Sequence, residues 1–324
     1  MENMIVSSSP HIRDKAHTST IMRDVCIALA PALIASVIYF GIRSLYITAL
    51  CMIFSVGAEF LWQKITKKNI TISDGTAAVT GMLLAFNLPV SAPWWICLIG
   101  SAVAIVIVKQ FFGGTGHNFM NPALAGRAFL LASWPVIMTH WTTPYSTGFI
   151  IGPDVVTTAT PLAIMKGTAE GNLPALTDLF LGNTGGCIGE VSSLALILGG
   201  VYLVARKVIS ARIPLAYILT VAVLTFIFPA SGLSGMESAA YNILSGGLML
   251  GAIFMATDYV TSPITARGQL IFGIGCGILT FVIRRFGAYP EGVSYSILLM
   301  NVVTPLIDRF TQPKPFGSVK GGAK

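Results

Sequence analysis

The stretch best suited to binding a small molecule is the glycine- and asparagine-rich segment of residues 112–129. Its closely spaced glycines let backbone N–H groups approach a ligand. Asn118 and Asn121 each offer hydrogen-bond donors and an acceptor, and Pro122 suits the first turn of a helix. Arg127 lies one turn further on and argues against a plain connection between two helices, because an arginine in an apolar helix requires an anionic partner.

Three acidic residues lie in or beside apolar stretches, where a charge needs a structural or functional reason. Glu59 is expected near the end of its apolar helix, at the interface with water. Asp74 suits the start of the next helix, where a carboxylate caps free N–H groups. Asp258 follows a glycine-rich apolar stretch, and the helix dipole disfavours an acid at a helix C-terminus. Asp258 is therefore a candidate binding residue, with a purely structural role as the open alternative.

The remaining polar motifs are less informative when taken alone. Thr157, Thr158 and Thr160 form a cluster that by composition belongs to a surface loop. The chain has no GxGxxG or Walker motif and no Ser/His/Asp spacing, so we assign no catalytic residue. Its five cysteines form no CxxC pair and its four histidines are dispersed, so no metal site is expected within the chain. A single cysteine could still supply one ligand to a site shared with a partner chain.

Composition predicts the elements that hold these residues. Of 324 residues, 54% are hydrophobic and only 10% are charged, whereas a soluble domain carries about 25% charged residues. So few charges cannot cover a water-soluble protein of this length, and disorder is excluded on the same grounds. The chain is therefore expected to be a polytopic membrane protein. Its net charge of +7 then reflects Lys and Arg in inner loops rather than nucleic-acid binding.

A spanning helix needs about 20 mostly apolar residues, and ten segments are candidates: 24–42, 44–62, 74–89, 93–111, 119–138, 189–206, 213–230, 240–257, 268–284 and 289–307. The positive-inside rule places both termini in the cytoplasm. On that side lie 15 basic residues, namely Arg13, Lys15, Arg23, Lys64, Lys67, Lys68, Lys109, Arg206, Lys207, Arg212, Arg267, Arg309, Lys314, Lys320 and Lys324. Only Arg43, Lys166, Arg284 and Arg285 lie outside, and the last two fit this orientation least.

The ten segments divide five and five around one long loop, so any internal repeat must be inverted. The third segment of each half is glycine-rich and ends near a proline, and the fifth contains an asparagine with a proline after it. The expected fold is therefore all-α, with two inverted five-helix repeats. The expected parts are a cytoplasmic N-terminal segment, the first repeat, an extracytoplasmic loop, the second repeat and a cytoplasmic tail, at residues 1–23, 24–138, 139–188, 189–307 and 308–324.

Three segments of this chain resemble motifs of one known family. Residues 157–163, Thr-Thr-Ala-Thr-Pro-Leu-Ala, resemble a flavinylation motif whose last threonine receives FMN through a phosphoester bond. Residues 112–123 and 255–263 match two further motifs in the same order. The chain thus resembles, over essentially its whole length, the RnfD/NqrB family of membrane subunits in ion-pumping respiratory complexes. It is most like RnfD, because the segment before its first expected span is short. Thr157 and Thr158 depart from the Ser-Gly pair that is common in the motif.

The resemblance implies a urea/ammonium-transporter-like inverted repeat and two flavins. By this resemblance FMN is expected to be covalently attached to Thr160, and a non-covalent riboflavin is expected between the halves, with Asn118, Asn121 and Asp258 as its candidate ligands. It further implies a subunit of the Rnf complex in the cell membrane, which couples electron flow between ferredoxin and NAD to export of Na⁺ or H⁺. The implied partners are the A, B, C, E and G components of Rnf, especially the flavinylated G component, together with membrane lipid and the flavin transferase that acts outside the cytoplasm.

Two other functions stay open from the sequence. A channel or transporter of the same fold would need polar or histidine residues along a continuous lumen, whereas the buried polar candidates here are mostly Asn and Asp. A scaffold subunit would only hold its partners together. A covalent flavin, visible as in-gel fluorescence after denaturation, would support the redox function and neither of these two.

Overall fold

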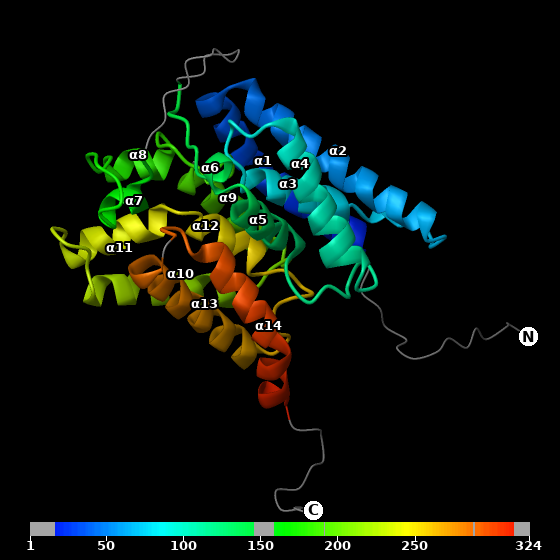
Figure 1. The fold of residues 1–324 in the computed structure, drawn as a ribbon. Helices are drawn as coiled ribbons and strands as arrows, with labels where there is room; N and C mark the ends of the chain where they lie inside the picture. The colour runs from blue at the N-terminus through cyan, green and yellow to red at the C-terminus, as the bar shows by residue number, and fades with distance from the viewer. Residues whose placement is uncertain (1–16, 146–158, 191, 288, 314–324) are drawn as a thin grey trace, which may run out of the picture.

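The computed structural model describes residues 17–145, 159–190, 192–287 and 289–313, which fold into helices with no β-strand (Figure 1). The first part of the chain forms α1 (Thr18–Phe40), α2 (Ile42–Ile65), the 3-10 turn η1 (Ile72–Asp74), α3 (Thr76–Phe86), α4 (Trp94–Ala102), the π-helix η2 (Val103–Gln110), α5 (Pro122–Ser133) and α6 (Pro135–Met138). The second part forms α7 (Pro161–Met165), α8 (Leu176–Leu181), α9 (Ser193–Ala205), α10 (Arg212–Ile227), α11 (Gly235–Leu244), α12 (Leu248–Leu250), the π-helix η3 (Gly251–Met255), α13 (Ala266–Phe286) and α14 (Val293–Thr311).

Within the described ranges, three helices are long and apolar enough to cross a membrane, namely α1, α2 and α13. A fourth span results if α11 and the helix of residues 248–255, which meet at 64°, count as one. Each of the ten expected ranges overlaps a helix, but several of these helices are short, such as α3 with 11 residues. The chain is therefore an all-helical membrane protein, and ten spans in an inverted repeat stay a prediction.

A glycine pair separates α11 from α12. Gly246 and Gly247 have φ angles of 74° and 67°, which lie in the left-handed region that favours glycine. A Cβ atom on Gly246 would come within 2.1 Å of Leu162 Cδ1. The break leaves the carbonyl oxygens of Ser245 and Gly246 available to a donor from elsewhere, and Arg284 Nη2 donates to both.

The two halves of the chain pack against each other through α1 with α9 and through α5 with α14. In Figure 1 the blue-to-cyan helices of the first half lie beside the yellow-to-red helices of the second. Gly199 lies at the contact between α1 and α9, where an added Cβ would lie 2.1 Å from the carbonyl oxygen of Ala28. Only glycine fits at this crossing without separating the helices.

Glu59 corrects one expectation from the sequence. Its side chain is not at the interface with water but fully buried, with 0% of its surface exposed. Lys109 Nζ lies 2.9 Å from one carboxylate oxygen, and Gln110 Nε2 donates to the same oxygen at 2.7 Å. Hydropathy along the chain cannot show that Lys109, which lies on another helix, pairs with Glu59. A buried carboxylate is tolerated once it is paired with a cation.

Asp74 lies just before α3, whose N-cap is Gly75, and it accepts a hydrogen bond from the first N–H of that helix as the sequence predicts. Its Oδ1 accepts the backbone N–H of Thr76 at 2.8 Å, at the first turn of α3. The hydroxyl of Thr76 also donates to Oδ1 and itself accepts from Lys109 Nζ, each at 2.7 Å. Asp74 therefore belongs to the same polar network as Glu59.

We predict opposite effects for two glycine-to-alanine substitutions. Gly199→Ala should destabilise the protein by about 1–3 kcal/mol, because the new methyl group meets the backbone of α1. Gly57→Ala is the control, since nothing lies within 4 Å of its added Cβ. It should stabilise α2 by about 0.5–1 kcal/mol. Thermal unfolding of the detergent-solubilised chain measures both, and an unchanged melting temperature for Gly199→Ala would contradict the close packing.

Candidate functional site

Thr160 is the N-cap of the short helix α7. Its backbone has the extended conformation of a capping residue, and its Oγ1 accepts the N–H of Ala163 at 3.3 Å. The side chain is half-buried, so the hydroxyl is neither sealed in the core nor fully in water. Thr157 and Thr158 lie outside the described residues.

A cavity of about 370 Å³ adjoins Thr160. Three aromatic residues of its lining are Trp141, Tyr289 and Tyr295. The two tyrosine rings stack with their centroids 6.2 Å apart and their planes at 25°. Arg127 also lines the cavity, so a cation and aromatic rings surround the same space.

Arg127 has the anionic partner that the sequence predicts. Its guanidinium forms an ion pair with Glu291, which lies just before α14 in the second half of the chain. Nη1 also donates to Asn87 Oδ1 at 3.0 Å and to Ser294 Oγ at 2.9 Å. Arg127 itself comes from α5, so these bonds fix α5 to both the end of α3 and the start of α14.

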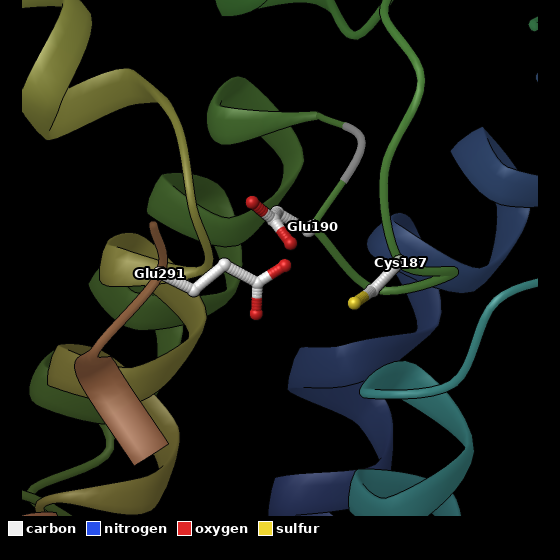
Figure 2. Close-up of side chains that lie close together, drawn as sticks. All are labelled: Cys187, Glu190 and Glu291. Carbon is white, nitrogen blue, oxygen red and sulfur yellow. The ribbon is translucent and has the colours of Figure 1, made fainter. Parts of the chain in front are cut away.

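A cluster beside this ion pair contains side chains that the sequence analysis did not single out. Sγ of Cys187 and one carboxylate oxygen each of Glu190 and Glu291 all lie within 4.8 Å of one another. Figure 2 shows the two carboxylates facing each other, with the sulfur turned toward the same space.

One sequence signal points to this cluster. Glu190 and Glu291 lie at the starts of the expected spans 189–206 and 289–307, which in the expected topology both begin on the outer side. Two acids at the same end of two spans are candidates for one site. The cysteine spacing does not reveal Cys187, because its neighbours come from distant parts of the chain.

Asn121 and Asp258 line one cavity of about 90 Å³, although they come from opposite halves of the chain. Asn121 is the N-cap of α5: its Oδ1 accepts from the N–H groups of Ala123 and Leu124 at 3.0 and 3.2 Å. Its Nδ2 donates to the carbonyl oxygen of Met255 at 3.2 Å. The side chain therefore also has a structural role at the contact between the halves.

Asp258 and Asn118 differ in their surroundings. Asp258 Oδ2 accepts from Thr261 Oγ1 at 3.0 Å, and burial raises the pKa of its carboxyl group. Asn118 is buried but does not line the cavity of Asn121 and Asp258. Its Nδ2 donates to the carbonyl oxygen of Met120 at 3.1 Å. The structure thus brings together two of the three candidate ligands.

Comparison with known proteins gives consistent similarities over nearly the whole chain. The profile described as the NQR2, RnfD, RnfE family matches residues 5–317. The chain is 55% identical over 320 residues to the D component of the Na(+)-translocating ferredoxin:NAD(+) oxidoreductase complex of Acetobacterium woodii, covering 98% of this chain and 96% of the relative. It is 47% identical over 323 residues to the D component of the proton-translocating ferredoxin:NAD(+) oxidoreductase complex of Clostridium ljungdahlii, covering 97% and 96%. It is 36% identical over 345 residues to the D component of the ion-translocating oxidoreductase complex of Halorhodospira halophila, covering 98% and 96%.

We predict strong coupling between Arg127 and Glu291. Arg127→Met should cost about 3–5 kcal/mol, because it leaves the Glu291 carboxylate without its cation. Adding Glu291→Gln should recover a large part of this loss, since the double variant has no unpaired charge at the pair. Unfolding of the four proteins in a double-mutant cycle measures the coupling.

The ion pair of Arg206 with Asp24 is the control. Asp24 is buried, but the arginine side chain is 55% exposed and Tyr202 also donates a hydrogen bond to Asp24. Arg206→Ala should cost no more than about 1 kcal/mol. Additive losses for Arg127→Met and Glu291→Gln would show that the two side chains do not act as a pair.

Proposed function

Because this chain belongs to the NQR2, RnfD, RnfE family, we propose that it is the flavin-carrying membrane component RnfD of an Rnf-type, ion-translocating oxidoreductase complex. The complex relays electrons between ferredoxin and NAD and exports an ion, and this chain completes no reaction alone. One relative is named for Na⁺ translocation and another for proton translocation. The names therefore leave the exported ion open for this chain.

The observation that carries the proposal is the position of Thr160 beside the aromatic cavity. A volume of about 370 Å³ lies within the range of small-molecule sites, about 300–1,000 Å³. Trp141, Tyr289 and Tyr295 offer ring faces to a flat conjugated ligand, and Arg127 offers a fixed positive charge. These residues fit FMN attached through Thr160 Oγ1, and the bound flavin would supply electron transfer.

The chain's own residues would hold this cofactor in three ways. A phosphoester at Thr160 would keep the flavin at a high effective concentration near its redox partner. Arg127 is held by Glu291, Asn87 and Ser294, so its guanidinium is positioned before any ligand binds. The aromatic walls would shield part of a bound flavin from water, which would strengthen electrostatic interactions there.

A second, non-covalent flavin is also proposed, with riboflavin held between the halves. Asn121 and Asp258 support it, because they line one cavity from opposite halves. In the described geometry that cavity is about 90 Å³, which is below the size of a site for a whole flavin. In this arrangement of the two halves the residues therefore fit only an edge of the flavin ring system.

The proposed architecture is an inverted repeat of five plus five helices in a cell membrane. The contacts of α2 with α3 and α4 are matched by those of α10 with α11 and α13, and α4 with α5 is matched by α13 with α14. The cross-contacts α1 with α9 and α5 with α14 each join the equivalent helices of the two halves. This pattern supports the repeat. We propose both termini in the cytoplasm, residues 139–188 outside, and the A, B, C, E and G components of Rnf as partners, with the flavin transferase acting on the outer loop.

We predict that Thr160→Ala abolishes covalent flavin. The substitution removes the acceptor oxygen and only one cap of a five-residue helix, so the chain should still assemble. Thr157→Ala and Thr158→Ala are the controls and should keep the flavin. Mass spectrometry of the tryptic peptide with residues 157–160, after co-expression with the transferase, gives the answer. FMN on Thr157 or Thr158, or no flavin mass on the wild-type peptide, would contradict the assignment.

We predict that Asn121→Asp lowers the content of non-covalent flavin while covalent FMN is unchanged. The aspartate keeps the acceptor that caps α5 but lacks the Nδ2 donor, so loss of the cap does not confuse the result. Removing a hydrogen bond to a buried ligand should cost about 1–3 kcal/mol. Asn118→Ala is the control, since Asn118 lies away from the cavity. Flavin extraction and chromatography quantify both, and unchanged riboflavin in a folded Asn121→Asp chain would remove Asn121 from the site.

A further inference from the structure

A second, much smaller cavity also adjoins Thr160. Its volume is about 20 Å³, and its lining includes Glu190, Glu291 and Ser245 as well as Thr160. A polar cavity of this size has room for one occupant as large as a water molecule. It is therefore separate from the aromatic cavity proposed for FMN, although the two share Thr160 and Glu291.

Ser245 indicates that this cavity holds an occupant. Its side chain is only 4% exposed, and its Oγ has no hydrogen-bond partner among the described residues. A buried hydroxyl that lacks a partner costs about 1–3 kcal/mol. Since Ser245 lines the cavity with the two carboxylates, a bound species that contacts its oxygen would remove this cost.

The oxygen atoms that line the cavity favour a cation. Among the described residues Glu190 forms no ion pair, while Oε2 of Glu291 is taken by Arg127 and its Oε1 accepts no hydrogen bond. Arg284 lies nearby, but its guanidinium donates to main-chain oxygens and the Asn242 amide oxygen rather than to a carboxylate. One carboxylate charge is thus left without an ion-pair partner beside the cavity.

We propose that Glu190, Glu291 and Ser245 bind one sodium ion in this cavity. Two carboxylate oxygens and a hydroxyl oxygen form a hard ligand set, which suits a hard cation. A divalent ion is disfavoured, because Arg127 and Arg284 already place two positive charges next to the cluster. Zinc is disfavoured as well: it would draw on the nearby sulfur as a thiolate, and burial raises the pKa of the Cys187 thiol well above its ordinary value.

The test uses the full-length chain in detergent, purified without sodium in choline chloride. A ligand that binds only the folded state raises the unfolding temperature with its concentration. Replacing choline by sodium at constant ionic strength should therefore raise the melting temperature and saturate. Equilibrium dialysis with radioactive sodium should give about one bound ion per chain.

Two variants and one control assign the effect to the cluster. Glu190→Gln removes the ligand charge and should weaken sodium binding by at least about tenfold. Ser245→Ala removes a neutral ligand and should weaken sodium binding less than Glu190→Gln does. If Glu190→Gln does not fold, Ser245→Ala still tests the site. Glu170→Gln is the matched control, because Glu170 is exposed in a nearby segment and outside both cavities. It should bind sodium like the wild type.

The outcomes separate this site from the proposed flavin function. Thr160→Ala lacks the flavin anchor but should still bind sodium. Equal melting temperatures in sodium and choline, or wild-type sodium affinity in both Glu190→Gln and Ser245→Ala, would overturn the cation site and point to a buried water. Covalent flavin in a chain that binds no sodium would overturn only the cation site. Sodium binding in a wild-type chain that never acquires flavin would overturn only the proposed function.

Discussion

The ion pair of Arg127 with Glu291 is the interaction on which the aromatic cavity and the small cavity beside Thr160 both depend. An arginine in an apolar helix is stable only when its charge is compensated and its donors are used. Glu291 supplies the charge, and Asn87, Ser294 and the sulfur of Cys187 accept further hydrogen bonds from the guanidinium. Those partners come from the end of α3, the segment before α14, and α14 itself. The pair thereby fixes one wall of the aromatic cavity and one carboxylate of the small cavity in a single arrangement.

The sequence predicts properties of single segments better than relations between them. Each expected span overlaps a helix, because apolar length is a local property. The need of Arg127 for an anion is likewise local, but its partner lies 164 positions further along the chain, and only the packing of α5 on α14 brings them together. The prediction that Glu59 lies at the interface with water is wrong for the same reason. Its partner Lys109 is 50 positions away in the sequence.

The candidate binding residues also show that the sequence does not predict contacts between distant segments. Asn121 and Asp258 meet at one cavity because α5 and the residues after η3 pack together. Asn118 has the same side chain and lies close to Asn121 in the sequence, yet it turns to the carbonyl of Met120. Motif spacing therefore selects the segment that matters, whereas the fold decides which of its side chains face the cavity. The acids of the small cavity have no common motif, since each is a lone glutamate just before a helix.

The dependence of Arg127 on Glu291 has a consequence for how the chain is made. Arg127 enters the membrane with the first half, and its anionic partner has not yet been synthesised. Arg284 has no such delay, because its acceptors Asn242, Ser245, Gly246 and Glu291 all belong to the second half. The first half alone therefore carries an uncompensated charge during translation. Joining both halves in one polypeptide keeps that interval short, whereas two separately inserted halves would have to meet in the membrane before the Arg127 ion pair and the cavity beside it could form.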